Sequence, residues 1–258
     1  MSPLPELRIA QFTDLHLVDL SENSEEFSLL KTSIGSSISE WNVDAVLLTG
    51  DLTQRGFSDS LPILSEYLSQ LPVPAIPAFG NHDKREVFLK SFPDPPNQAP
   101  EDRGIAPYAG VWDLGSTDIF VLDSNVDDDG NGNLSPVQLE WLSQQLKIST
   151  ASDSIVVVHH PVLSSPLRTL ERPVFLGLED LDRVLLGSTV RVILSGHYHH
   201  SGATVRNGIL GWSGPAFCWE TDLSADSGSR RLDHRAWSLI RLHDHIPSCV
   251  PIPIGNNK

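Results

Sequence analysis

Residues 7–16 read LRIAQFTDLH, a short apolar segment that runs directly into an acid and a histidine spaced two positions apart. Its continuous apolarity and short length are typical of a strand buried on both faces of a sheet. The two polar groups, Asp14 and His16, lie where such a strand would end. Ligands and catalytic groups gather beyond the carboxyl ends of strands in open α/β sheets. This stretch therefore predicts a strand that carries part of a functional site.

Four further apolar segments end in the same way, in an acid, an asparagine or histidines. They are residues 45–49, followed by Gly50-Asp51; 75–79, followed by Gly80-Asn81-His82-Asp83; 155–158, followed by His159-His160-Pro161; and 190–194, followed after one residue by Gly196-His197-Tyr198-His199. Because the carboxyl ends of parallel strands meet at one edge, we expect these residues to converge on a single cleft.

The spacing within the motifs points to metal binding. Alternate residues of an extended backbone point to the same side, so Asp14 with His16, and His197 with His199, are each predicted to form a chelating pair. Three glycines at the strand ends allow sharp turns, which bring backbone and side chains close to a bound ion: Gly50, Gly80 and Gly196.

Each of these residues also has an ordinary structural explanation. A single aspartate at a strand end is usually a turn former or a helix cap, and a single histidine is more often a hydrogen-bonded core residue. The joint pattern is stronger than its parts, because seven of the ten histidines lie in or beside these motifs. We therefore favour the functional interpretation of the set.

Helical patterns separate the apolar segments. The expected helices cover residues 27–41, 60–71, 84–92, 136–146 and 178–186, and one more strand covers 119–122. Ser135 is a suitable N-cap, and Pro136 fits the first helical position after it. The alternation of strands and helices predicts an α/β fold.

The alternation breaks twice. Residues 93–104 are rich in proline and aspartate and predict a loop, and after His200 the segments 203–212 and 236–242 are typical of antiparallel strands. We therefore expect a mixed sheet, or two packed sheets, with helices outside. Residues 1–258 are expected to form a single domain in which 243–258, with three prolines, is an extended C-terminal tail over the surface.

The composition is that of a folded globular protein, with 40% hydrophobic and 20% charged residues. A formal net charge of -15 argues against a nucleic-acid polymer or an anionic membrane as partner. The start of the chain has no signal-peptide pattern and no segment is apolar enough to span a membrane, so we expect a cytoplasmic protein. Cys218 and Cys249 lack metal-type spacing, and separate thiols are favoured over a disulfide.

In order along the chain, the motifs D-x-H, G-D, G-N-H-D, a later strand-end histidine and G-H-x-H resemble those of the calcineurin-like metallophosphoesterase superfamily. The match runs from Asp14 to His199, roughly three-quarters of the chain, without a missing ligand. The contexts F-T-D-L-H and H-H-P look most like the class III cyclic nucleotide phosphodiesterases and their glycerophosphodiesterase relatives. The resemblance implies a four-layered α/β/β/α sandwich with mixed sheets.

Carried over residue by residue, the resemblance implies a centre of two metal ions. One ion would be held by Asp14, His16 and His199, a second by Asn81, His159 and His197, and Asp51 would bridge them. His82 would lie beside the substrate phosphate, with Asp83 behind it to orient its ring. His160 and His200 match neighbouring positions that are not ligands, and we expect structural or supporting roles for them.

The chemistry of this ligand set favours hydrolysis of a diester. Imidazole-rich sites suit Mn or Fe, which we favour, or Zn or Co, better than Mg or Ca. Two such ions about 3.5 to 4 Å apart turn a bridging water into hydroxide and clamp the phosphoryl group for in-line displacement. Two divalent cations and two carboxylates leave a charge of about +2, which hydroxide and a diester monoanion neutralise. His82, as a neutral or cationic imidazole, would then donate a hydrogen bond or a proton to the leaving alkoxide.

We therefore expect a metal-dependent phosphodiesterase that hydrolyses a small phosphodiester such as a cyclic nucleotide. A phosphomonoesterase or a glycerophosphodiester phosphodiesterase on the same scaffold is the alternative, because the metal ligands determine the reaction class and not the leaving group. A non-catalytic interaction module would require lost ligands, and all of them are present. The sequence leaves the oligomeric state open between a monomer and a homodimer.

Two other segments allow more than one interpretation. Residues 127–132, DDDGNG, partly match a calcium loop, but the expected glutamate is Gln138, and an acidic turn is favoured. Trp212 and Trp219 lie in a loop broken by glycine soon after the last ligands. They are expected to pack in a hairpin or, alternatively, to stack against a nucleobase.

Overall fold

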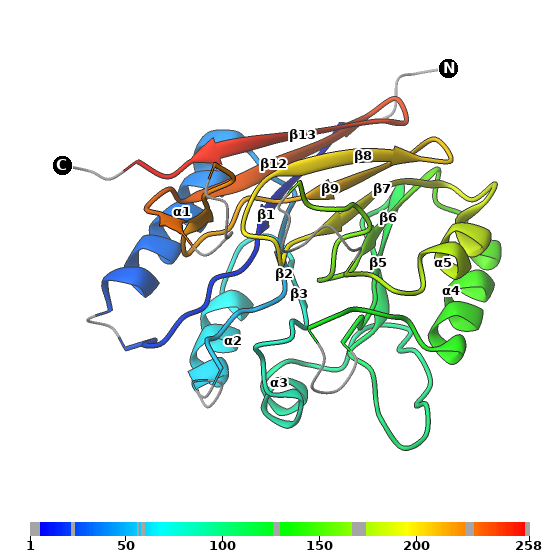
Figure 1. Ribbon diagram of the computed structural model, residues 1–258, viewed down its shortest axis with the longest axis horizontal. Helices are drawn as coiled ribbons and strands as arrows, with labels where there is room; N and C mark the ends of the chain where they lie inside the picture. The colour runs from blue at the N-terminus through cyan, green and yellow to red at the C-terminus, as the bar shows by residue number, and fades with distance from the viewer. Residues whose placement is uncertain are drawn as a thin grey trace.

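Two β-sheets lie face to face in the computed structural model, which describes residues 6–21, 24–55, 57, 60–125, 130–166, 174–224 and 230–255 (Figure 1). The first sheet has the order β13 (Ile246–Pro253), β12 (Ala236–His243), β1 (Leu7–Phe12), β2 (Ala45–Thr49) and β3 (Ala75–Ala78). The second has the order β4 (Gly110–Asp113), β5 (Thr117–Val121), β6 (Asp153–Val157), β7 (Val190–Ser195), β9 (Ile209–Ser213) and β8 (Gly202–Arg206). A short ribbon pairs β10 (Glu220–Thr221) with β11 (Arg231–Leu232).

The strand directions place the predicted motifs together. In the first sheet β1, β2 and β3 are parallel, and in the second β5, β6, β7 and β9 are parallel. The residues that follow β1, β2, β3, β6 and β7 therefore emerge at the carboxyl ends of strands within each sheet. Both sheets are mixed, because β12 runs antiparallel to β1 and β4 runs antiparallel to β5.

Helices cover the outer face of each sheet, which confirms the predicted four-layered α/β/β/α architecture (Figure 1). The helices α1 (Glu25–Trp41), α2 (Leu61–Ser69) and α3 (Arg85–Ser91) share one apolar cluster with the first sheet. The helices α4 (Pro136–Ile148) and α5 (Leu178–Leu185) share another with the second sheet. A third cluster, built from the inward side chains of both sheets, fills the space between them.

Local sequence signals explain where the longest helices begin. Ser24 Oγ accepts a hydrogen bond from the backbone N–H of Phe27 at the start of α1. Ser135 does the same for Gln138 at the start of α4, and Pro136 occupies the first turn, as predicted. These caps satisfy backbone donors that a helix start otherwise leaves unpaired. None of the helices in the described ranges combines the length and apolarity needed to span a bilayer.

The C-terminal segment differs from the prediction. Residues 246–253 are not a loose tail but form β13, an edge strand paired with β12 along its length. Its prolines, Pro247, Pro251 and Pro253, are spaced by even numbers, so all three direct their missing N–H to one side of the strand. An edge strand tolerates this because its outer side has no partner strand. Strand β4 was also not predicted from sequence.

Two further expectations concern single segments. Cys218 and Cys249 are free thiols, as favoured from their spacing. Residues 127–129 of the acidic calcium-like segment lie outside the described residues.

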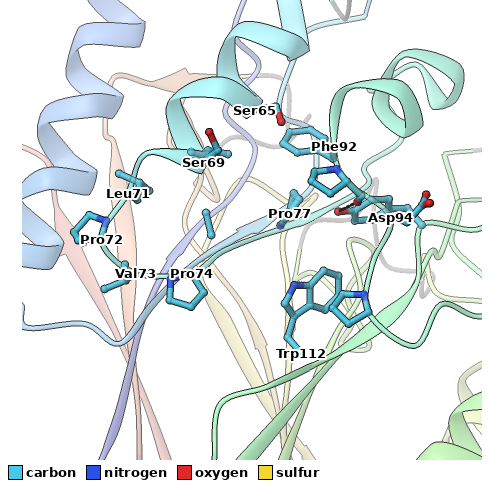
Figure 2. A pocket seen from close by; sticks show the side chains of 15 residues that line it. Ser65, Ser69, Leu71, Pro72, Val73, Pro74, Pro77, Phe92, Asp94 and Trp112 are labelled. Carbon is cyan, nitrogen blue, oxygen red and sulfur yellow. Dashed lines mark hydrogen bonds between the residues drawn. The ribbon is translucent and has the colours of Figure 1, made fainter.

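A hollow of about 490 Å³ lies where α2, β3 and the loop leading to β4 meet (Figure 2). Prolines and aromatics line it, among them Pro74, Pro77, Phe92 and Trp112. It contains none of the predicted site residues.

Candidate metal centre

The predicted ligands come together at the carboxyl ends of the parallel strands. At one end of the cluster, Nε2 of His16 lies 3.1 Å from Nε2 of His199. The Oδ1 atom of Asp14 is 3.4 Å from the same His199 nitrogen. Asp14 is completely buried and His199 nearly so, which makes this a desolvated cluster of one carboxylate and two imidazoles.

The other end of the cluster is built around an amide. Oδ1 of Asn81 lies 3.0 Å from Nε2 of His159 and 3.0 Å from Nδ1 of His197. His159 is fully buried at the end of β6, and His197 follows β7. This second group contains the three residues that the sequence assigned to a second ion.

Asp51 lies between the two groups. Its Oδ2 atom is 3.5 Å from Nε2 of His16 and 3.4 Å from Nε2 of His159. Its Oδ1 atom accepts a hydrogen bond of 2.8 Å from the backbone N–H of His82. The carboxylate thus contacts one imidazole from each end of the cluster, the position that a bridging ligand requires.

The D-x-H and H-x-H pairs were predicted to lie on extended backbone, and this prediction is wrong. Asp14, His16, Asp51, His197 and His199 all have positive φ, between 46° and 71°. This left-handed conformation is unfavourable for residues with a Cβ and persists where the surrounding structure imposes it, often at functional sites. The turns also separate His197 from His199, so these two face different ends of the cluster and do not chelate one ion together.

Two glycines are required by the close approach of these turns. A Cβ atom on Gly80 would lie 2.0 Å from the backbone nitrogen of Asp51, and one on Gly196 would lie 1.9 Å from Oγ1 of Thr13. Both contacts are far shorter than any van der Waals distance. The absence of a side chain therefore lets loops from different strands touch.

The buried charges attract cations. Burial alone would raise the pKa of Asp14, but the neighbouring His199 holds it well below its usual range. Burial opposes ionisation of Asp51 too, yet His159 keeps its pKa below the usual range. Conversely, burial would lower the pKa of His159, but Asp51 raises it to about 9. Two buried carboxylates that stay ionised beside imidazoles have the electrostatics of a cation site, and the donors fit a divalent transition-metal ion.

The sequence profile of calcineurin-like phosphoesterases matches residues 7–201. The chain belongs to the calcineurin-like phosphoesterase family. This confirms the predicted superfamily and the assignment as an enzyme that hydrolyses phosphoesters. The match ends just beyond the last predicted ligand, so it contains every strand that contributes to the cluster.

Named relatives agree with the class III resemblance of this phosphoesterase. It is 29% identical to a probable cyclic nucleotide phosphodiesterase of Rhodococcus erythropolis, over 98% of this chain and 85% of that protein. It is also 29% identical to a cAMP/cGMP dual specificity phosphodiesterase of Mycobacterium tuberculosis, over 99% of this chain and 82% of that protein. A dimetal phosphatase from Danio rerio has the same fold, with a TM-score of 0.64 at 16% identity, covering 95% of this chain and 98% of that one.

Backbone carbonyls and one amide orient three of the histidines predicted as ligands in this phosphoesterase. Nδ1 of His16 donates to Oε1 of Gln54 at 2.7 Å, and Nδ1 of His159 donates to the carbonyl of Thr49 at 2.9 Å. Nδ1 of His199 faces the carbonyl of Trp219 at 3.3 Å. Each contact leaves Nε2 directed at the cluster. These partners were not predicted from the sequence, because no local pattern marks a carbonyl that comes to lie beside a histidine only after folding.

His82 lies against the cluster without being one of its predicted ligands. Its ring meets that of His16 edge-on, with centroids 4.6 Å apart. Its Nδ1 atom is buried and has no hydrogen-bond partner among the described residues. Burial lowers the pKa of His82, which favours the neutral imidazole.

Asp83 does not orient the His82 ring, contrary to expectation. Its carboxylate accepts hydrogen bonds from the backbone N–H groups of Leu52, Thr53 and Gly80, at 3.0 to 3.3 Å, and from the Thr53 hydroxyl. These donors belong to the two loops that carry Asp51 and Asn81. Asp83 therefore joins the loops, and its effect on the centre is through their backbone.

His160 and His200, the two other histidines of the motifs, have supporting contacts, as expected. Nδ1 of His160 lies 2.9 Å from the Ser124 hydroxyl, and Nε2 of His200 lies 2.9 Å from the Ser165 hydroxyl. Trp212 on β9 is buried, and its indole N–H donates to Ser238 on β12, so it packs in the core between the two sheets.

Trp219 behaves differently from Trp212. Its ring centroid is 4.0 Å from that of His199, and the Arg231 guanidinium lies 4.0 Å above the same ring. Two groups so close to the centroid cannot share a face, so each covers one face of the indole. Neither face is then free to stack against a nucleobase.

Proposed function

We propose that this phosphoesterase hydrolyses small phosphodiesters, cyclic nucleotides in particular, at a centre of two divalent ions. The observation that carries the proposal is the position of the Asp51 carboxylate, 3.5 Å from His16 and 3.4 Å from His159, between the two donor groups. Asp14, His16 and His199 would hold one ion, and Asn81, His159 and His197 the other. Ions bound there supply an acidified water and a clamp for the phosphoryl group.

The protein orients the predicted ligands and excludes water from them. Asp14, Asp51 and His159 have at most 2% of their surface exposed, so they are presented to a ligand with almost no hydration of their own. The carbonyl of Thr49 and the amide of Gln54 hold the rings of His159 and His16 in one tautomer. Donors held this way need little reorganisation when an anionic substrate binds.

His82 is the candidate N–H donor to the leaving oxygen. It lies beside His16, and its backbone N–H is fixed by Asp51 at 2.8 Å. An alkoxide leaving group has a high proton affinity, so an N–H donor beside it lowers the barrier. A ring nitrogen without a protein partner is available for that role.

Three considerations favour a diester and a transition metal. Two carboxylates beside two divalent ions leave a charge of about +2, which a hydroxide and a diester monoanion neutralise, whereas a monoester dianion exceeds it. Curated relatives carry the names of cyclic nucleotide phosphodiesterases. Four imidazoles and one amide among seven predicted ligands suit Mn or Fe, with Zn or Co as alternatives.

One comparison tests the substrate class. Protein loaded with Mn²⁺ is assayed against bis-p-nitrophenyl phosphate, p-nitrophenyl phosphate, cyclic AMP and glycerophosphodiesters. We expect kcat/KM to be higher for the aryl diester than for the matched monoester, and cyclic AMP to be hydrolysed. A tenfold preference for the monoester would assign the protein to the phosphatases, and activity confined to glycerophosphodiesters would replace the cyclic nucleotide as substrate.

A further inference from the structure

A second cavity, of about 350 Å³, lies between the start of α3, the loop after β5 and the start of α4. Arg85, three residues after His82, forms part of its wall, as do Asn125 after β5 and the first turn of α4. Ser124, next to Asn125, contacts His160, whose ring lies 4.6 Å from that of His197. The volume is within the usual range of small-molecule sites. Ser124 and His160 therefore link the wall of the cavity to the predicted ligand His197.

Asn125 in this wall has an unused amide. Its Oδ1 and Nδ2 atoms are buried, and neither has a hydrogen-bond partner among the described residues. Leaving a buried acceptor and donor unpaired destabilises a fold, whereas an apolar side chain of the same shape would not. Nothing in the packing of this loop explains an amide here, which points to a ligand as its partner.

The backbone that carries Asn125 is firmly held. Its N–H donates to Oδ1 of Asp123 at 3.1 Å, and Asp123 also forms an ion pair with Arg85. The Gln138 side chain bonds both the N–H and the carbonyl of Asp123, at 3.0 and 2.9 Å. The amide is thus a free recognition group on a rigid support, the arrangement expected of a binding site.

We propose that this cavity binds the nucleoside part of the substrate and that the Asn125 amide pairs with the edge of a purine base. The inference rests on the proposed function. An amide presents an acceptor beside a donor, the complement of the adjacent N–H and ring-nitrogen groups of adenine. His82 is assigned to the leaving oxygen, which stays attached to the ribose, so the nucleoside lies beyond His82, and Arg85, three residues further along the chain, forms part of the wall of this cavity.

The test replaces Asn125 by leucine, which has a similar shape and no polar atoms. With Mn²⁺ bound, we expect Asn125→Leu to raise KM for cyclic AMP about tenfold and to leave hydrolysis of bis-p-nitrophenyl phosphate, which has no nucleoside, within about twofold of wild type. The melting temperature should be unchanged or higher, because two unpaired buried groups are removed. Gln144→Leu, an exposed amide on α4, is the matched control and should alter neither substrate.

The outcomes separate this inference from the proposed function. If wild type hydrolyses cyclic AMP and Asn125→Leu does so equally well, the nucleoside site is wrong and the function stands. If wild type does not hydrolyse cyclic AMP, the proposed function is wrong, and calorimetric titration with adenosine decides on the cavity alone. Binding by wild type that Asn125→Leu loses supports the site; equal binding or none overturns it. A lower melting temperature would show that Asn125 is structural.

Discussion

Nε2 of His16 lies 3.1 Å from Nε2 of His199, although 183 positions separate the two residues. Two ligands of one transition metal, each about 2.0 to 2.1 Å from the ion, are roughly 3 Å apart. The spacing of these two nitrogens therefore matches a shared ion. Each ring is held from behind, His16 by Gln54 and His199 by the Trp219 carbonyl. His16 and His199 thus meet with their rings already oriented for a shared ion.

Asp51→Asn should remove metal and activity together. The Asp51 carboxylate lies between the two donor groups, and without its charge two cations held close together repel each other. Because loss of an outer partner already weakens metal binding by about 10- to 100-fold, we expect loss of this ligand to exceed that range. Metal analysis after gel filtration, with kcat on bis-p-nitrophenyl phosphate, checks this. Two retained equivalents of metal with near-normal turnover would refute the bridging role.

His82→Ala should slow hydrolysis while the metal content stays nearly intact. The His82 side chain is beside His16 but is not assigned to an ion, so only the leaving group loses a donor. The loss should reach about 10²- to 10⁴-fold for cyclic AMP and be smaller for an aryl diester, because p-nitrophenolate departs without a proton. Measured kcat values on both substrates decide the point when chemistry is rate-limiting. Equal losses would assign His82 to the phosphoryl oxygens instead.

Gly196→Ala should disrupt the centre from the backbone. The added Cβ would lie 1.9 Å from Thr13 Oγ1 and 2.5 Å from Asp14 Oδ2, so the Asp14 loop must move. We expect about 1 to 3 kcal/mol of lost stability and weaker metal binding. Gly35→Ala is the control: it lies inside α1 with nothing within 4 Å and should stabilise the protein by about 0.5 to 1 kcal/mol. Similar stabilities for the two variants would contradict the close contact.

Asp83→Ala should destabilise the fold and the metal centre alike. The substitution removes the acceptor for the backbone N–H groups of Leu52, Thr53 and Gly80. Each of these N–H groups, if left buried and unpaired, would lower the free energy of unfolding by about 1 to 3 kcal/mol. Denaturant unfolding and Mn²⁺ titration measure the two effects, with the exposed Glu140→Ala on α4 as control. A variant of normal stability whose only defect is in the alkyl-diester rate would return Asp83 to the role of orienting His82.

Mn²⁺ should raise the melting temperature of the wild-type protein. An ion that binds only the folded state stabilises it by about 2.7 kcal/mol at a hundred times its dissociation constant. In Asp51→Asn the shift should be largely absent, which makes melting a test of binding that does not depend on turnover. An equal shift in both proteins would place the ion elsewhere.

The sequence by itself predicted the strands that carry the site, their helical connections and the seven candidate ligands that the fold brings together. Apolar segments of four to six residues, each ending in Asp, Asn or His, permit few other structures, because buried strands must place polar groups at their ends. The predictions for β1 and β2 match the observed bounds at both ends. Ser135 as N-cap of α4 was predictable for the same reason: its partner, Gln138, is three residues away.

Only the tertiary structure decided how those residues are arranged. The left-handed turns at Asp14 and His199, the separation of His197 from His199 and the bonds of Asp83 to two loops depend on contacts between segments far apart in sequence. The strand β13 escaped prediction because its prolines are acceptable only at a sheet edge, and no local pattern identifies an edge. Side-chain type and spacing act locally, so they determine the strands and the candidate ligands. The backbone turns that direct those ligands are imposed by packing between the two sheets. No single segment of the sequence contains that information.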